Sequence, residues 1–146
     1  MKTVTGLYDQ DFYAWAMKNA ELIRQGRLAE TDLEHITEEL ESMGRSEWYE
    51  LVDRLAVLLA HLLKWRYQPE RRGNSWRLTI KEQRQRVGLR LKKSPSLQYE
   101  LDETLAEAYE SAVLKAAKEM KVAESWFPPT YPFALEQVLD TDYWPD

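Results

Sequence analysis

The apolar residues of this chain recur at intervals of three and four positions, the spacing of one face of an α-helix. The clearest pattern predicts a long helix that begins near Ser46 and ends before Pro69. No stretch alternates apolar and polar residues as a half-buried strand does. The apolar stripe of the long helix consists of Trp48, Leu51, Val52, Leu55, Leu58, Leu59, Leu62 and Leu63.

Two shorter helices are predicted before the long one. The first covers residues 9–25, with Asp9 as its N-cap and Gly26 as the left-handed residue that ends it. The second covers residues 31–43 and ends at Gly44. Its predicted buried face consists of Leu33, Ile36, Leu40 and Met43.

Further helices are predicted after a loop at residues 71–74. A fourth helix, capped by Asn74 or Ser75, buries apolar positions as far as Leu91, and a fifth begins at Ser94-Pro95. A short helix near residues 132–139 and an apolar, aromatic C-terminal tail complete the chain, and we expect the tail to be docked. These patterns predict an all-α fold: one bundle domain over residues 1–146, with about five main helices, a short C-terminal helix and the docked tail.

The composition excludes several classes of protein. The 146 residues contain no cysteine, which excludes disulfides and thiolate metal sites. No apolar run approaches the roughly 20 residues that span a bilayer. The N-terminal sequence has no apolar core of a signal peptide, so we expect no secretion signal and no membrane partner. The expectation is a cytoplasmic protein.

Charge is distributed unevenly along the chain. The segment Lys64–Lys93 holds eleven basic and two acidic residues, a net charge of +9. The remaining chain holds nine basic and 23 acidic residues, a net charge of −14, and the whole chain has −5. This asymmetry indicates either an acidic partner or a basic segment that lies across the protein's own acidic helices.

Several stretches together match a known family in order along the chain. They are Tyr8-Asp9-x-Asp11-Phe12-Tyr13-x-Trp15, Glu38–Gly44, His61–Arg72, Ser75-Trp76-Arg77-x-Thr79-Ile80, Phe127-Pro128 and Leu135-Glu136-Gln137. In these stretches the chain resembles the bacterial domain-of-unknown-function family twenty-nine. The resemblance implies an all-α fold and a family without an assigned activity, and it supplies no catalytic or binding residues.

Polar residues beside the apolar faces suggest a metal site. His61 belongs to a stripe that flanks the apolar face of the long helix, and Asp32, His35 and Glu39 share one side of the preceding helix. If the two stripes face each other, these four residues would suit a divalent metal, Zn, Fe or Mn, in a hydrolytic enzyme. The structural alternative is a hydrogen-bonded core histidine.

Other catalytic motifs give little support for an enzyme. Nucleophile elbows, phosphate loops and dinucleotide fingerprints are absent from the sequence. Glu38-x-x-Glu41 with Glu50-x-x-Asp53 resembles the acidic pairs that hold Mg²⁺ in helical nucleotide pyrophosphohydrolases. Acidic pairs at this spacing are also common on solvated helix faces. Whether the protein is an enzyme stays open, and we expect that it is not.

The basic segment supplies the leading expectation, a non-enzymatic interaction module that binds an acidic protein surface through Arg66–Lys93. The candidate contacts are Arg66, Arg71, Arg72, Arg77 and Arg84. Nucleic acid is the alternative partner, because aromatic and basic residues alternate here, although a pI near 5.2 argues against it. An apolar patch left uncovered on the first or fifth helix would indicate a homo-oligomer.

Overall fold

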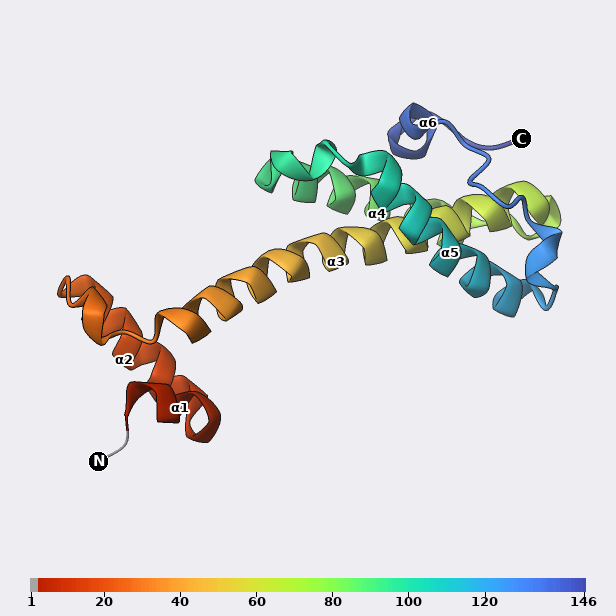
Figure 1. Cartoon of the computed structure of the whole chain (residues 1–146). Helices are drawn as coiled ribbons and strands as arrows, with labels where there is room; N and C mark the ends of the chain where they lie inside the picture. Colours follow the sequence, from red (N-terminus) through yellow and green to blue (C-terminus); the bar gives the residue numbers. More distant parts are fainter. Residues whose placement is uncertain (1–2) are drawn as a thin grey trace. The chain divides into compact units, whose positions relative to one another are not determined.

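The structure is a computed structural model that describes residues 3–146, and within this range its regular elements are all helical (Figure 1). This confirms the all-α fold class. No helix in the described range has both the length and the apolar character that a membrane crossing requires. The α-helices are α1 (Val4–Gln10), α2 (Phe12–Arg24), α3 (Leu33–Tyr67), α4 (Asn74–Lys93), α5 (Leu101–Met120) and α6 (Leu135–Leu139).

The first predicted helix is two helices. Asp11 interrupts it with a non-helical backbone, and its side chain accepts a hydrogen bond from the backbone NH of Ala14 at 3.0 Å. Asp11 therefore caps α2, and the prediction that Asp9 is the N-cap was wrong. The end of α2 was predicted correctly, because Gly26 adopts a φ of +75° and its NH donates to the carbonyl of Ile23.

The predicted break at Gly44 does not exist. Helix α3 continues through this residue for 35 residues in all, and Gly26 is the glycine with a positive φ in the described range. A glycine inside a helix costs only about 1 kcal/mol, so the residues on either side extend the helix across it. The fifth helix also begins later than predicted, because Pro95–Gln98 forms a 3-10 turn before α5 begins at Leu101.

Contacts divide the chain into two compact units, one ending at Ser46 and the other beginning at Glu47. The single domain over residues 1–146 stays a prediction. The N-terminal unit has a small interior, in which Trp15 and Leu22 are the buried apolar residues among those described. Two polar residues, Asn19 and Asp32, are buried with them.

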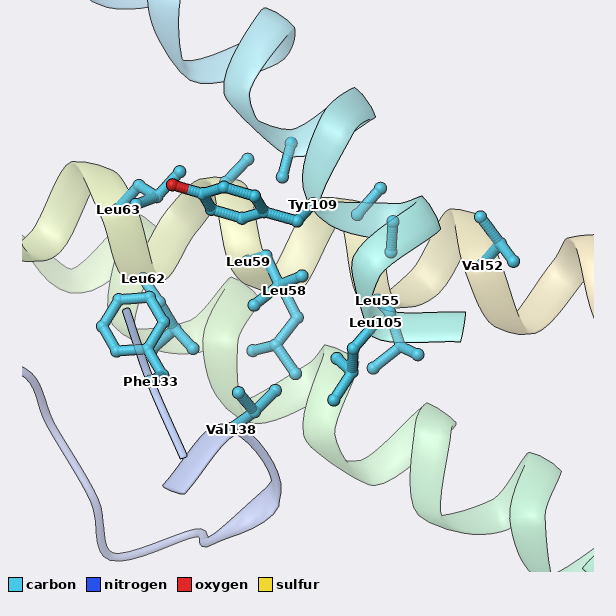
Figure 2. Packing of buried hydrophobic residues seen from close by; sticks show 14 of the residues in the cluster. Val52, Leu55, Leu58, Leu59, Leu62, Leu63, Leu105, Tyr109, Phe133 and Val138 are labelled. Carbon is cyan, nitrogen blue, oxygen red and sulfur yellow. The ribbon is translucent and has the colours of Figure 1, made fainter. Parts of the chain in front are cut away.

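The C-terminal unit has a much larger apolar core (Figure 2). The stripe predicted on α3 forms its centre, and helices α4 and α5 cover it. Phe133 and Val138 of the C-terminal segment are also buried, and the ring of Trp144 lies 4.7 Å from that of Trp65. The aromatic tail is therefore docked, as predicted. Figure 2 labels the central core residues Leu55, Leu58, Leu59, Leu62, Leu105, Tyr109, Phe133 and Val138.

Candidate functional site

Asp32 and His35, two of the predicted metal ligands, lie together in the N-terminal unit. The buried carboxylate of Asp32 accepts hydrogen bonds from Trp15 Nε1 at 2.9 Å and from His35 Nδ1 at 2.6 Å. The side chain of Asn19 completes the network, because its Oδ1 accepts from the Asp32 NH and its Nδ2 donates to the Trp15 carbonyl. The network joins α2 to the first turns of α3.

Glu39, the third predicted ligand of this unit, has a different partner. Its carboxylate accepts a hydrogen bond from the hydroxyl of Tyr8. The ring of Tyr8 stacks on that of His35 with 3.9 Å between the centroids. The hydrogen bond to Glu39 raises the pKa of the Tyr8 hydroxyl to about 12. Tyr8 thus holds α1 against α3 at neutral pH.

The contact between Asp32 and His35 shifts the pKa of each group toward its charged form. The hydrogen bond to Asp32 raises the pKa of the His35 imidazole above its usual 6.5. Burial by itself would raise the pKa of the Asp32 carboxyl, but hydrogen bonds from the side chains of His35 and Trp15 and from the His35 NH lower it overall. The pair is local to the start of α3, and the hydrogen bond from Trp15 connects it to α2.

His61 lies in the C-terminal unit and contacts the backbone. Its Nδ1 donates to the carbonyl of Val57 at 2.9 Å, one helical turn earlier. Burial lowers the pKa of the imidazole below 6.5. No group of three or more His, Asp or Glu side chains able to hold a metal ion occurs in the part of the chain that the structure describes. The structural role of His61 is supported, and the metal site of His61, Glu39, Asp32 and His35 stays a prediction.

Arg84 does not belong to a partner-binding surface. Its side chain is buried, and its guanidinium donates to the carbonyls of Val138, Tyr143 and Gln137 at 2.9, 2.8 and 3.1 Å. The arginine therefore anchors the C-terminal segment on α4. The sequence placed Arg84 at an interruption of the apolar face, which is the signal that it points inward.

Other basic side chains of the segment bind the protein itself. Arg72 donates from Nε to the Trp65 carbonyl at 2.6 Å, and its guanidinium lies 5.4 Å from the centre of the Trp65 ring. On α4, the remaining internal pairs are Arg86 with Glu82, Arg90 with Glu47 and Glu50, and Lys93 with Glu47. The basic segment thus partly covers the protein's own acidic side chains, one of the two alternatives that the charge pattern left open.

A set of basic side chains stays on the surface of the C-terminal unit. Arg66, Arg71, Lys81 and Lys92 are exposed and form no ion pair within residues 3–146. Arg77 is partly exposed and donates to Asn74 Oδ1. At 100° per residue, the spacing places Arg77, Lys81 and Lys92 within about 60° on one side of α4, over about 22 Å. We call these three residues the basic stripe.

A polar pocket of about 290 Å³ lies beside this surface, at the end of α3. Its lining residues are Lys64, Gln68, Arg71, Trp76 and Glu119. Lys64 is only 4% exposed and forms an ion pair with Glu119, and its ammonium lies 5.0 Å from the centre of the Trp76 ring. Lys64 and Glu119 were not among the site residues predicted from the sequence. A lysine directly after the leucines of a buried stripe was the available signal.

Two other hollows are more apolar. A pocket of about 580 Å³ lies between α5 and residues 124–129, and none of the predicted site residues lines it. In the N-terminal unit, a groove of about 390 Å³ runs along α2 and the first half of α3, with Ile23, Leu40, Met43 and Glu39 among its lining residues. Apolar side chains on α2 are exposed, and the homo-oligomer that such a patch would indicate stays a prediction.

These features define an all-helical protein with a leucine-rich core, an internally bonded histidine on α3 and a partly unpaired basic surface. The chain belongs to the family described as Domain of unknown function DUF29, whose model matches residues 7–144 of the 146. This confirms the resemblance stated from the sequence. No curated protein and no solved structure matches the chain.

Proposed function

We propose that this protein is a non-enzymatic interaction module that binds an acidic surface of another protein through the exposed basic residues of Arg66–Lys93. The observation that carries the proposal is the exposure of Arg66, Arg71, Lys81 and Lys92 without ion-pair partners in residues 3–146. Exposed cations on one surface raise the local concentration of an acidic partner and speed its association. In this proposal the protein acts in the bacterial cytoplasm.

Nucleic acid is the less favoured partner because the aromatic side chains of the segment are engaged internally. Trp65 packs against Trp144, Tyr67 packs edge-on against Phe127, and the Trp76 ring lies beside the Lys64 ammonium. Single-stranded nucleic acid is bound by exposed rings on which bases stack. The net charge of −5 further opposes a polyanion as long as a nucleic acid.

Reversal of charge on the basic stripe tests the proposal. The variant Arg77→Glu/Lys81→Glu/Lys92→Glu is compared with Lys18→Glu/Lys115→Glu/Lys118→Glu, which changes the net charge equally at exposed lysines outside the segment. Binding of fluorescent polyglutamate at low salt is measured by anisotropy. We expect about a tenfold loss of affinity for the stripe variant and little change for the control.

Two outcomes would contradict the proposal. Equal losses in both variants would mean that net charge alone governs binding, so that no specific surface exists. Tighter binding of a labelled DNA duplex than of polyglutamate, with the same dependence on the stripe, would favour the nucleic-acid alternative.

The alternative of a metal-dependent enzyme is tested separately by metal analysis of protein purified without a histidine tag.

A further inference from the structure

The polar pocket at the end of α3 is assembled from three consecutive structural elements and one distant helix. Lys64 and Gln68 come from the last residues of α3 and the position after it, and Arg71 comes from the 3-10 turn Pro69–Arg71. Trp76 lies in the first turn of α4, and Glu119 lies in the last turn of α5. All five residues belong to the C-terminal unit.

The lining has one excess positive charge. Lys64 is buried, and a buried ammonium requires a counter-charge, which Glu119 supplies. The side chain of Glu119 is 57% exposed, so this counter-ion sits at the mouth of the pocket. Arg71 is exposed, and its guanidinium forms no ion pair or side-chain hydrogen bond within residues 3–146. One monoanion would neutralise the pocket.

We propose that this pocket binds a single carboxylate group, the side chain of a glutamate or aspartate presented by an acidic partner. A guanidinium matches the two oxygens of a carboxylate, so Arg71 would hold the group in a fork of two hydrogen bonds. The amide of Gln68 offers a further donor. The Trp76 ring offers a flat apolar wall for the methylene groups of the same side chain.

Size and charge favour this occupant over others. A volume of about 290 Å³ lies at the lower end of small-molecule sites and suits one side chain better than a cofactor. A phosphate monoester carries about −1.5 to −2 charges at neutral pH, which exceeds the single positive charge of the lining. The inference rests on the proposed function, because it names how one residue of the acidic partner is recognised.

The test uses the indole NH signal of Trp76 in the full chain, assigned by comparison with the Trp76→Phe variant. The probe is N-acetylglutamate N-methylamide, and the control probe is its neutral glutamine analogue. We expect the glutamate compound to shift the signal with saturation and the glutamine compound to leave it unchanged. No saturable shift, or equal shifts from both compounds, would overturn the inference. A saturable shift of the Trp76 signal with inorganic phosphate, but not with the glutamate compound, would also overturn the inference.

Two substitutions should change the affinity in opposite directions. Arg71→Gln removes the unpaired cation and should weaken binding of the glutamate compound about tenfold, while Lys115→Gln, at an exposed cation of the same unit outside both the basic segment and the pocket, should not. Glu119→Gln removes the internal competitor and should tighten binding severalfold. If Glu119→Gln fails to fold, the comparison of Arg71→Gln with Lys115→Gln still decides, since both side chains are exposed. Equal effects of these two substitutions would refute the pocket.

The outcome is separable from that of the proposed function. The basic stripe used to test the proposed function does not line the pocket. If polyglutamate binding depends on the stripe but Trp76 never responds to the glutamate compound, the interaction module stands and the carboxylate pocket is wrong. If polyglutamate binding does not depend on the stripe and the Trp76 signal does not shift, the interaction module and the carboxylate pocket are both wrong.

Discussion

His35 and His61 both belong to α3, yet their surroundings shift their pKa values in opposite directions. The hydrogen bond to Asp32 raises the pKa of His35 above 6.5. Burial lowers the pKa of His61 below 6.5. Since a pKa that differs between the folded and unfolded states makes stability depend on pH, the two histidines should dominate different pH ranges.

Above pH 6.5, the free energy of unfolding should fall with increasing pH. A histidine with a raised folded pKa stabilises the fold fully below its unfolded pKa, and this contribution is lost as pH rises through the folded pKa. His35→Gln should abolish the fall.

Below pH 6.5, the lowered pKa of His61 makes stability decrease as pH falls, and His61→Gln should abolish that decrease. Urea unfolding across the pH range measures both, and exchanged effects of the two variants would contradict the assignment.

Arg84 and Arg86 provide a second comparison two residues apart on α4. Arg84→Ala leaves three carbonyl acceptors of the C-terminal segment without their donor. Because each buried acceptor left without a donor costs at least about 1 kcal/mol, we expect a loss of about 3 kcal/mol or more in the free energy of unfolding. Arg86→Ala removes only a surface pair with Glu82 and should cost under about 1 kcal/mol.

Urea unfolding monitored by circular dichroism gives both values. Similar losses for the two variants would show that Arg84 does not anchor the segment. Limited proteolysis supplies an independent readout, since the residues after Val138 should be cut sooner in Arg84→Ala than in Arg86→Ala.

Single residues of the candidate site were predictable only where the interaction is local. The contact between Asp32 and His35 follows from their spacing of one turn at the start of a helix. The hydrogen bond from Tyr8 to Glu39 joins residues 31 positions apart. The contact of Lys64 with Glu119 joins residues 55 positions apart. Which residues meet at such distances depends on the packing of whole helices, and periodicity within one helix does not specify it.

At the scale of elements, the continuity of α3 through Gly44 is the main difference from the prediction. A glycine ends a helix when its φ is positive, as at Gly26. The φ of a glycine is not encoded in its identity, so Gly26 and Gly44 looked alike in the sequence. The leucines of the predicted stripe between residues 51 and 63 of α3 are buried. The buried face predicted for the preceding helix was largely wrong, because Leu33, Leu40 and Met43 are 57%, 62% and 64% exposed.

Substitution of the two glycines by alanine should change stability with opposite signs. A Cβ at Gly44 would meet no atom within 4 Å, so Gly44→Ala should stabilise by about 0.5–1 kcal/mol through higher helix propensity. Gly26→Ala should destabilise by about 1 kcal/mol, because alanine is strained at a φ of +75°. The measurement is urea unfolding. Destabilisation by Gly44→Ala would instead support the helix end that the sequence predicted at Gly44.

For the whole molecule, the two units differ in how much apolar surface they bury. Trp15 and Leu22 are the buried apolar residues described before Glu47, whereas the core after it includes fully buried leucines of α3 and α5. Local stability follows buried apolar contact. We expect the amides of α2 to exchange with solvent faster than those of residues 51–63 and of α5. Hydrogen exchange measured by mass spectrometry tests this, and equal protection would instead support the predicted single domain.

Charge sorting is the property that connects the whole molecule to its proposed function. The net charges of +9 for Lys64–Lys93 and −14 for the remainder were evident from the sequence. The sequence did not show which of these basic residues form internal pairs and which stay exposed. That division depends on which acidic side chains α4 faces. Arg84 and Arg90 are used internally, while Lys81 and Lys92 are exposed and unpaired in the described range.

The affinity for fluorescent polyglutamate at increasing salt concentration tests this central claim most directly. Salt screens exposed charges that act at the surface. We predict that the affinity of the unmodified protein falls steeply with added salt. The variant Arg77→Glu/Lys81→Glu/Lys92→Glu should bind more weakly and respond less to salt. An affinity that changes neither with salt nor with these substitutions would contradict the account.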